Sequence, residues 1–448
     1  MTYSRWATEE EVKEKLVPVN YDSEIKKSGI GLMYDDKTLY IKDDEAHSLI
    51  IGSTGSGKTQ TCLLPQLRLA IKANESFILH DVKGEVYDKL IGELKKQKYN
   101  TIVINLADPS TGDNFNPLSL PYKLYKEGER DKSVDILENI GKYIFSEYNY
   151  DASRDPFWEA SAMSLFVGLT IYLFENAKED EINLSSISVI SSEFSKLKEY
   201  VNTIDKSSLI YMYLSPVVLA PSETAGSILA VFKQKIKLLT SRESLSKMMS
   251  KTNFDIANIQ NEKTALFIIS DNKSNSKTLI PMIIDECYNA VMNEKEHNRR
   301  LNIIIDEFEG LSAIKEFNTV LSFSRSINIK FSVFVKSLLE LNNVYGVDNA
   351  TLLRLCFGNI IYLLANDMYT LEEMSKLCGN VNIEGNIKPL ISVEELKLLN
   401  MFEAVVLIPR SYPIKTKLLP DYVIDWKFDT TTYEIPKNDN ENVKIYNI

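Results

Sequence analysis

Short runs of mostly apolar, often β-branched residues alternate with stretches of helical periodicity over the first hundred residues. These runs cover residues 39–41, 49–51, 77–80 and 101–104. Parallel strands need a long crossover, usually a helix, so this alternation is typical of a parallel sheet covered by helices. The pattern therefore predicts an α/β fold for this part of the chain.

The pattern changes near residue 116. Residues 120–255 carry apolar positions spaced three and four apart, most clearly over 131–146, 156–175 and 223–239. Strand-like runs then return at 265–269, 301–305, 329–335, 359–364 and 404–408. The simplest interpretation is a mainly parallel α/β domain that is interrupted by an all-α domain.

This organisation also agrees with the length of the chain. At 448 residues the chain exceeds the size that one hydrophobic core usually serves. We predict an N-terminal segment (1–30), two parts of the α/β domain (31–119 and 259–426), the all-α domain between them (120–258) and a flexible C-terminal tail (427–448). The tail is assigned because residues 430–448 are rich in Asn, Asp, Glu and Thr.

A glycine-rich motif directly follows the apolar run that ends at Ile51. It fits the phosphate-binding pattern G-x-x-x-x-G-K-[ST] without a mismatch, and with the next residue it comprises Gly52, Ser53, Thr54, Gly55, Ser56, Gly57, Lys58, Thr59 and Gln60. The backbone N–H groups of such a loop converge on phosphates, and the positive end of the following helix favours the anion. Lys58 is expected to reach the β- and γ-phosphates of ATP, and Thr59 to ligate Mg²⁺. A simple Gly/Ser turn is the alternative, but the order strand, loop, helix favours a nucleotide site.

A phosphate loop also needs a carboxylate at the end of a neighbouring strand. Residues 301–305 form a mostly apolar run, and Asp306 and Glu307 follow where this strand leaves the sheet. Asp306 is expected to hold the hydrated Mg²⁺, and Glu307 to act as general base on the attacking water. An exposed acidic turn is the alternative. An acidic pair beside a phosphate loop favours hydrolysis over nucleotide sensing, so we predict an ATPase.

Two further segments are less specific. Asp81 follows the apolar run 77–80 and is expected to emerge beside the phosphate loop, although the segment equally fits any strand-to-helix turn. Residues 114–118 (N-F-N-P-L) form a turn that closes the first strand region, and plain structure explains this turn as well as function does.

Composition and charge narrow the possible partners. Hydrophobic residues make up 44% and charged residues 25%, as in ordinary globular enzymes. The net charge is −11, so the protein is not coated with the basic surface that tight, non-specific duplex binding requires. Any contact with nucleic acid must therefore be local.

Cysteine, histidine and the apolar segments indicate a reducing, cytoplasmic compartment. The four cysteines have no C-x-x-C spacing, and the three histidines form no metal-ligand pattern. The N-terminus lacks the apolar core of a signal peptide. The longest apolar run, 160–174, is expected to be too short to span a bilayer and to form a buried helix instead.

Several motifs together resemble the type IV coupling proteins of conjugation and type IV secretion, the TraG-type family of the FtsK/HerA motor group. The resemblance covers most of the chain. It rests on residues 4–8 (S-R-W-A-T), on 47–59 with a histidine before the loop, on 81–85 (D-V-K-G-E for the family's D-P-K-G-E), on 115–118 (F-N-P-L) and on 304–308 (I-I-D-E-F). Their order and spacing are far more specific than any single motif.

The resemblance implies a RecA-like fold and a hexameric ATPase that moves DNA. Members recruit a relaxase-bound DNA strand and pass it to the type IV secretion channel, and their all-α domain receives substrates. An arginine of the neighbouring subunit stabilises the transferring phosphoryl group in such motors. Arg325 matches the family's position for this finger, and Arg354 is a weaker candidate.

Two departures from the family pattern affect these expectations. Lys336 stands where the family usually has a glutamine that senses the γ-phosphate, and we expect it to contact phosphate instead. The family normally begins with transmembrane helices, and none precedes Trp6. We therefore expect a soluble version, cytoplasmic and peripheral at the inner face of the membrane, with a separate membrane-anchor protein as a possible partner.

Two other functions remain open from the sequence. One is a secretion ATPase that recruits only protein substrates. The other is a module that binds ATP to hold an oligomer together without hydrolysing it. The complete set of Lys58, Thr59, Asp306 and Glu307 disfavours the second alternative.

Overall fold

The computed structural model describes residues 3–35, 37–146, 156–271, 274–438 and 442–448. The chain divides into two compact units, which we describe separately. The first comprises Met1–Thr101, Asn258–Phe267 and Lys295–Tyr433, and the second comprises Ile102–Ala257, Ile268–Glu294 and Glu434–Ile448. The five segments predicted from the sequence stay predictions, and their residues 1–2, 36, 147–155, 272–273 and 439–441 lie outside the described residues.

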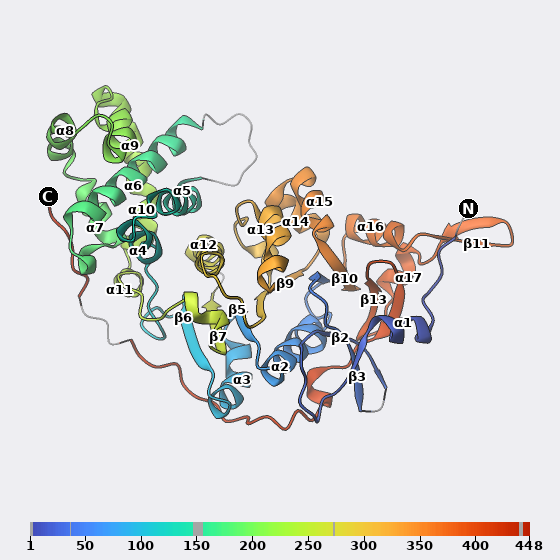
Figure 1. Cartoon of the computed structure of the whole chain (residues 1–448). Coiled ribbons are helices and arrows are strands. Elements are labelled where there is room, and N and C mark those ends of the chain that lie inside the picture. The colour runs from blue at the N-terminus through green and yellow to red at the C-terminus, as the bar shows by residue number, and fades with distance from the viewer. Residues whose placement is uncertain (1–2, 36, 147–155, 272–273, 439–441) are drawn as a thin grey trace. The chain divides into compact units, whose positions relative to one another are not determined.

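A nine-stranded sheet dominates the fold, in the order β14-β13-β10-β4-β9-β8-β5-β7-β6 (Figure 1). Its strands are β4 (His47–Gly52), β5 (Ser76–Val82), β6 (Asn100–Asn105), β7 (Thr264–Ser270), β8 (Leu301–Ile305), β9 (Ile329–Val335), β10 (Phe357–Leu364), β13 (Glu403–Leu407) and β14 (Ile414–Lys417). The five strands from β10 to β5 pair in parallel, and β13 and β14 add antiparallel pairs. All residues of β4, β8 and β9 are buried, which explains their mostly apolar sequences. The predicted α/β fold with a mainly parallel sheet is confirmed.

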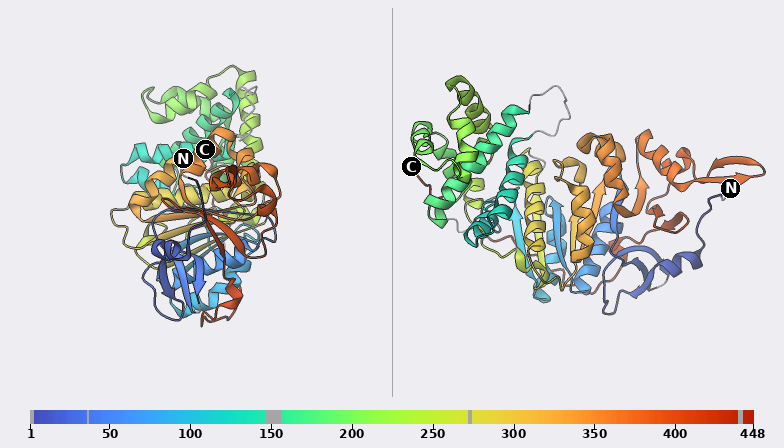
Figure 2. Two further views of the ribbon diagram at one scale, coloured as in Figure 1. Left: turned by 90° about the vertical axis from the view of Figure 1, so that its right-hand side faces the viewer. Right: turned by 45° about the horizontal axis from the view of Figure 1, so that its top comes forward.

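Helices cover both faces of this sheet in the first unit. They are α2 (Leu64–Lys72) and α3 (Glu85–Lys96) on one face, and α13 (Phe317–Ser324), α14 (Leu338–Tyr345) and α15 (Val347–Leu355) on the other (Figure 2). The chain crosses the sheet in one direction from β4 to β5 and in the other from β8 through β9 to β10. Because crossovers between parallel strands are right-handed, opposite directions place the connecting helices on opposite faces.

A smaller antiparallel sheet holds one strand that the sequence placed in the parallel sheet. Its strands are β1 (Val17–Asn20), β2 (Ile30–Asp35) and β3 (Thr38–Lys42), in the order β1-β3-β2. The expectation that residues 39–41 join the parallel sheet is wrong. Leu39 and Ile41 instead pack with Leu69 of α2 and with Trp426. A run of three apolar residues carries no information about its pairing partner, so only the long-range packing assigned it.

The remaining elements of the first unit are short. They are α1 (Glu9–Lys15), α16 (Met368–Cys378), α17 (Val393–Lys397) and the hairpin of β11 (Asn380–Ile383) and β12 (Asn386–Pro389). Thr8 begins α1 with a capping box, in which its side chain accepts the N–H of Glu11 and the Glu11 carboxylate accepts the N–H of Thr8.

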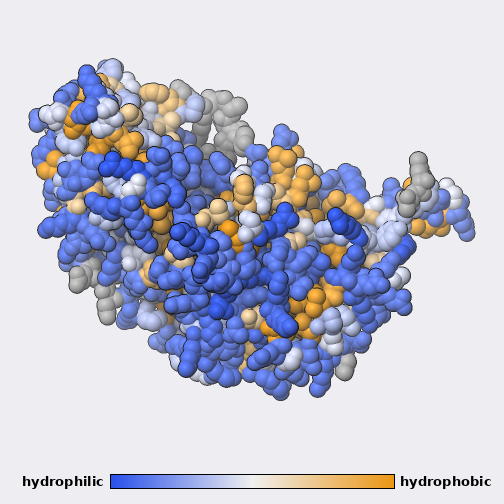
Figure 3. Space-filling model, in the orientation of Figure 1, coloured by the Kyte–Doolittle hydropathy of each residue, from blue (hydrophilic) through white to orange (hydrophobic). Residues whose placement is uncertain are grey.

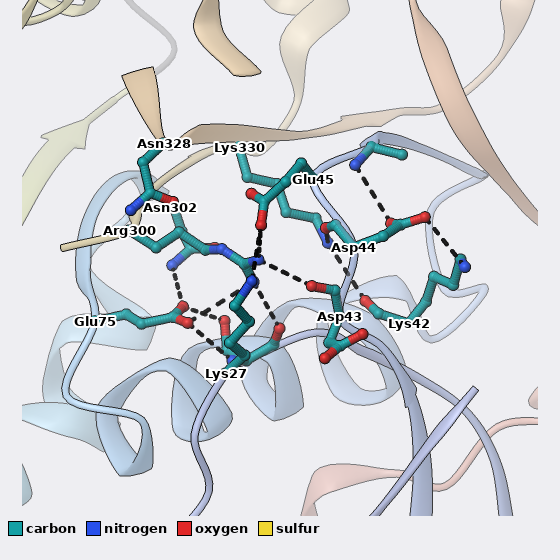
Figure 4. A network of polar contacts seen from close by, with 12 residues as sticks. Lys27, Lys42, Asp43, Asp44, Glu45, Glu75, Arg300, Asn302, Asn328 and Lys330 are labelled. Atoms are coloured by element: carbon teal, nitrogen blue, oxygen red, sulfur yellow. Dashed lines mark hydrogen bonds and ion pairs between the residues drawn. The ribbon is translucent and has the colours of Figure 1, made fainter. Parts of the chain in front are cut away.

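A buried polar network lies where strands β5, β8 and β9 begin (Figure 4). The Arg300 side chain, only 3% exposed, donates to Glu45 Oε1 at 2.6 Å and to the Ser28 carbonyl at 3.0 Å. Its Nη1 is 3.7 Å from Glu75 Oε1, and Glu75 also accepts the N–H of Ser28 at 3.0 Å and an amide hydrogen of Asn302 at 2.8 Å. Arg300 therefore compensates two carboxylates, one of them deeply buried.

A buried lysine adds a second link between the small sheet and the main sheet. Lys330 of β9 donates to the carbonyls of Lys42 at 3.3 Å and Asp44 at 3.0 Å. Burial lowers the pKa of Lys330 to about 8. The residues at the end of β3 are thus tied to the start of β9 by charge-assisted hydrogen bonds.

We expect Arg300→Ala to destabilise the protein by about 3–5 kcal/mol, because it leaves the buried Glu75 carboxylate without its cation. Urea denaturation followed by circular dichroism measures this loss. Arg325→Ala removes the same side chain from an exposed position and serves as the matched control. Equal unfolding midpoints for the two variants would show that the network contributes nothing to stability.

The second unit is mostly helical. Its helices are α4 (Ser119–Lys126), α5 (Arg130–Phe145), α6 (Phe157–Asn176), α7 (Leu184–Ile190), α8 (Phe194–Thr203), α9 (Leu209–Val218), α10 (Ser222–Thr240), α11 (Glu243–Met248) and α12 (Ser274–Met292). The three helices predicted at 131–146, 156–175 and 223–239 correspond to α5, α6 and α10, with bounds within one residue.

Helix α6 is the centre of this bundle. It has 20 residues, and among the described residues it is one helix that is long and apolar enough to cross a membrane. The expectation that its apolar run is too short to do so is therefore wrong. Helices α9 and α10 reach that length and apolar composition only when taken together, and they are bent by 110° relative to each other. Of the most apolar stretch of α6, 61% is buried within the protein. Gly168 lets α9 approach closely, since a Cβ there would lie 2.5 Å from Leu214. These contacts confirm the predicted burial of the helix.

The C-terminal segment makes specific contacts with the helices of the second unit. Lys444 forms an ion pair with Asp180 at 2.6 Å, and its carbonyl accepts the side-chain amide of Asn183 at 2.8 Å. The N–H of Tyr446 donates to Ser186 Oγ at 3.0 Å. Residues 442–448 therefore contact α7 and the segment between α6 and α7, although their composition predicted a flexible tail.

Candidate functional site

The glycine-rich loop begins where β4 ends at Gly52. The N–H of Ser53 donates to the Leu364 carbonyl at the end of β10, at 2.8 Å, and the N–H of Ser56 donates to the Ser53 carbonyl at 3.1 Å. A Cβ at Gly52 would overlap Ser56 Oγ and lie 2.9 Å from Lys58 Cγ. Gly57 has φ +91°, and a Cβ there would lie 3.0 Å from the Phe402 ring. Both glycines are therefore required by the tight path of the loop.

The helix after the loop begins with a wide turn. Residues Thr59–Leu63 form π-type backbone hydrogen bonds, and α2 continues from Leu64 with Pro65 in its first turn. Pro65 has no N–H to donate to the carbonyl four residues earlier, which favours a wider turn at this point. Thr61 stabilises the turn, because its N–H and its hydroxyl both donate a hydrogen bond to the Gly57 carbonyl.

Lys58 lies folded back over the loop. Its ammonium donates to the Gly52 carbonyl. Burial lowers the pKa of Lys58, while the charges of Asp306 and Glu309 oppose this effect. The cation thus lies near the carboxylates at the end of β8, with one loop carbonyl as its hydrogen-bond partner.

Asp306 and Glu307 follow β8 at the same edge of the sheet. Asp306 is partly buried, and its Oδ1 accepts the N–H of Glu307 at 3.0 Å. Burial raises the pKa of Asp306, although Lys58 acts in the opposite direction. Glu307 has a left-handed backbone (φ +47°) and a half-exposed side chain. Strand β9 lies between β4 and β8, so the expected direct neighbourhood of the two motif strands is wrong. The two motifs meet because parallel strands end at one edge.

His80 and Asp81 at the end of β5 support this edge. The Nδ1–H of His80 donates to the Asp306 carbonyl at 2.7 Å, and burial lowers the pKa of His80 to about 4. Asp81 Oδ2 accepts the N–H groups of Val86 and Tyr87 at the start of α3. Asp81 therefore caps α3. Because β5 lies beside β8, Asp81 emerges next to Asp306 and not beside the phosphate loop, where the sequence analysis expected it.

His47, the histidine before the loop, has a structural role at the other end of β4. Its Nδ1 accepts the N–H of Phe331 in β9 at 3.0 Å, and its Nε2–H donates to the carbonyl of Leu321 in α13 at 2.7 Å. Burial lowers the pKa of His47 to about 4, so the ring is neutral. It joins β4, β9 and α13.

Lys336 directly follows β9, the strand that lies between the loop strand β4 and the acidic strand β8. Its ammonium lies 3.3 Å from Glu309 Oε1 and 3.8 Å from Glu307 Oε2. These two carboxylates raise the pKa of Lys336 against the opposing effect of burial. The structure therefore places the sequence-predicted Lys336 beside Glu307.

Glu309 is a residue of this site that the sequence analysis missed. It lies in the 3₁₀ turn Phe308–Gly310 after β8, and its side chain is only 5% exposed. A signal was present, because Glu309 is the third acid within four residues, 306–309. Phe402 was also missed, and nothing in its local sequence connects it with the loop.

The structure does not bring Arg325 to this edge. Arg325 begins the 3₁₀ turn Arg325–Ile327 ahead of β9, whereas Lys336 follows that strand. A seven-residue strand is about 20 Å long, so Arg325 lies at the opposite edge of the sheet from the loop. Its side chain is exposed. Arg354 is instead engaged with Glu373 at 3.6 Å and with the Tyr369 ring.

The residues of the loop edge suit a magnesium nucleotide. The hydroxyls of Ser53 and Ser56 are buried and have no hydrogen-bond partner, so the loop has polar atoms left to satisfy. Among the described residues, no group of three or more His, Cys, Asp or Glu could hold a metal alone. Mg²⁺ fits such a site, because it is usually held by one or two protein groups, water and substrate phosphates. Thr59 and Asp306 are the protein groups available here.

Residues 4–387 match the family model described as "Type IV secretory system Conjugative DNA transfer". No curated protein matches the chain. Among solved structures, the plasmid coupling protein TrwB in complex with ADP and Mg²⁺ is similar with a TM-score of 0.71 and 16% identity, and 94% of each chain is covered. TrwB with a non-hydrolysable ATP analogue gives the same values. VirB4 of Thermoanaerobacter pseudethanolicus is similar with a TM-score of 0.53 and 13% identity, over 88% of this chain and 97% of the other.

Proposed function

The chain belongs to the type IV secretory system conjugative DNA transfer family, and from this premise we propose that it is a coupling ATPase. It hydrolyses ATP to drive a relaxase-bound DNA strand into the transfer channel at the inner face of the membrane. The observation that carries the proposal is the gathering of Lys58, Asp306, Glu307 and Lys336 at one sheet edge. These are the groups that phosphoryl transfer to water requires.

The loop from Gly52 to Gln60 binds the phosphates of ATP, with Lys58 moving from the Gly52 carbonyl to the β- and γ-phosphates. Thr59 and Asp306 hold Mg²⁺, which supplies charge neutralisation on the phosphate oxygens when it is bound. Glu307 accepts a proton from water as the water oxygen attacks the γ-phosphorus. The bond between that phosphorus and the bridging oxygen breaks, giving ADP and inorganic phosphate. Lys336 contacts the terminal phosphate.

Arg325 acts on the site of a neighbouring copy in an oligomer, which we take to be a hexamer. Exposed apolar side chains gather over α13 to α15 (Figure 3), and those exposed there are Phe323, Leu339, Val347, Leu352 and Leu355. An apolar patch of this kind typically marks a protein interface. Arg325 directly follows α13, so a second copy seated on the patch would receive this arginine.

We expect Arg325→Ala to lower ATP turnover by about 10³-fold in a homogeneous oligomer, as loss of an arginine finger does. Because the finger acts between subunits, mixing this variant with Lys58→Ala, which has an intact finger, should restore activity at shared interfaces. Turnover of the mixed oligomers measures the effect. If mixtures of the two variants show no turnover above either alone, Arg325 does not act in trans.

The decisive experiment on function is ATP turnover of the purified protein with and without DNA. We expect single-stranded or duplex DNA to raise turnover several-fold, with a modest salt dependence, because only local basic surfaces contact the strand. An ATP turnover rate that does not change with DNA of any length would instead support an ATPase that recruits only protein substrates. Absent turnover alone, with DNA and with relaxase would show a non-hydrolysing module.

A further inference from the structure

Glu309 is a buried acid beside the proposed ATP site, and none of the roles above uses it. Its side chain is 5% exposed, and neither carboxylate oxygen has a hydrogen-bond partner. Its one ion-pair partner among the described residues is Lys336, at 3.3 Å. A carboxylate in such surroundings is costly unless a cation compensates it.

The backbone on both sides of this ion pair is firmly held. Phe308, next to Glu309, is buried and stacks on Tyr345 of α14, with ring centroids 5.7 Å apart. Lys336 follows the buried strand β9, and Ser337 after it caps α14 by accepting the N–H of Glu340. The Lys336 side chain is 35% exposed, so it has more room to change its conformation than the Glu309 side chain, which is 5% exposed.

Lys336 therefore lies between two carboxylates with different tasks. Glu307 is the proposed base, and its Oε2 is 3.8 Å from the ammonium, whereas Glu309 is nearer and more buried. Without Glu309, the flexible ammonium would pair with Glu307 and compete for the carboxylate that must accept a proton. With Glu309 present, the attraction is shared and the ammonium is drawn away from the base.

We propose that Glu309 is a positioning residue for ATP hydrolysis, which holds Lys336 toward the terminal phosphate and keeps it from pairing with Glu307. This inference rests on the proposed ATPase function. It also explains how a lysine can serve at the position where the family resemblance predicts a glutamine, because the buried Glu309 carboxylate compensates the charge of the lysine.

The test is a double-variant cycle with Glu309→Gln, Lys336→Gln and both together. We expect each single variant to lower kcat about tenfold, equivalent to about 1.4 kcal/mol of transition-state stabilisation, with little change in KM. Because both residues act through one contact, the double variant should lose about tenfold and not about a hundredfold. Glu316→Gln, which removes an exposed glutamate at the start of α13, is the matched control and should leave kcat unchanged.

Two readouts separate this inference from the proposed function. Urea denaturation without nucleotide should show Lys336→Gln as less stable than the double variant, because only the single variant leaves Glu309 uncompensated; this measurement needs no hydrolysis. Wild-type protein without turnover would refute the ATPase proposal and, with it, the role of Glu309 in catalysis. Wild-type turnover together with an unchanged kcat for Glu309→Gln, or losses that multiply in the double variant, would overturn the inference alone.

Discussion

Replacing Lys58 by alanine is expected to lower ATP turnover by at least about 10²–10³-fold, the loss typical when a main charge-stabilising group is removed. Lys58 is partly buried near Asp306 and has a loop carbonyl as its hydrogen-bond partner, so its charge is available for phosphate. Phosphate release measures turnover, and titration with a fluorescent ATP analogue measures binding, which should weaken as well.

Lys89→Ala is the matched control, because Lys89 is exposed on α3 and its loss removes the same charge. It should hydrolyse ATP like the wild type. Undiminished hydrolysis by Lys58→Ala would show that the glycine-rich loop is not the phosphate site.

Glu307→Gln is expected to retain ATP binding while hydrolysis falls by about 10²–10⁴-fold, the usual contribution of a general base. The substitution preserves shape and removes only the ability to accept a proton from water. Binding of a non-hydrolysable ATP analogue and turnover at saturating ATP together measure the separation. Both should be recorded on protein whose circular dichroism matches the wild type.

The chain contains a close control for this variant. Glu316 has the same left-handed backbone as Glu307, with φ +46° against +47°, and it also precedes a short helix. Glu316→Gln tests whether such a position tolerates glutamine, and it should hydrolyse ATP normally. A Glu307→Gln protein that fails to bind nucleotide or to fold would indicate a structural role for Glu307.

Motifs that are continuous in sequence were predicted well. The loop from Gly52 to Thr59 and the strand before Asp306 are recognisable because their residue types are required locally: small residues for a tight backbone path and mostly apolar residues for a fully buried strand. The same reason made the central strands and the long helices of the second unit predictable.

Features that depend on strand order were not predictable in this way. The sequence indicated that Asp306 and Lys58 act together, but not that β9 lies between their strands and brings Lys336 to the same edge. Because the strand order was not known from the sequence, Asp81 was expected beside the phosphate loop. In the structure it caps α3. The pairing of Glu309 with Lys336 joins residues 27 positions apart, and no local pattern specifies it.

By itself, the sequence determined that this protein has an α/β fold with a phosphate-binding loop and an acidic strand, and it indicated the family. These properties follow from short-range requirements of backbone geometry and burial. Only the tertiary structure decided which side chains share the site, that Arg325 lies at the opposite edge, and that a buried glutamate accompanies Lys336. Such relations depend on the order in which parallel strands pair, and that order is set by packing across the whole domain.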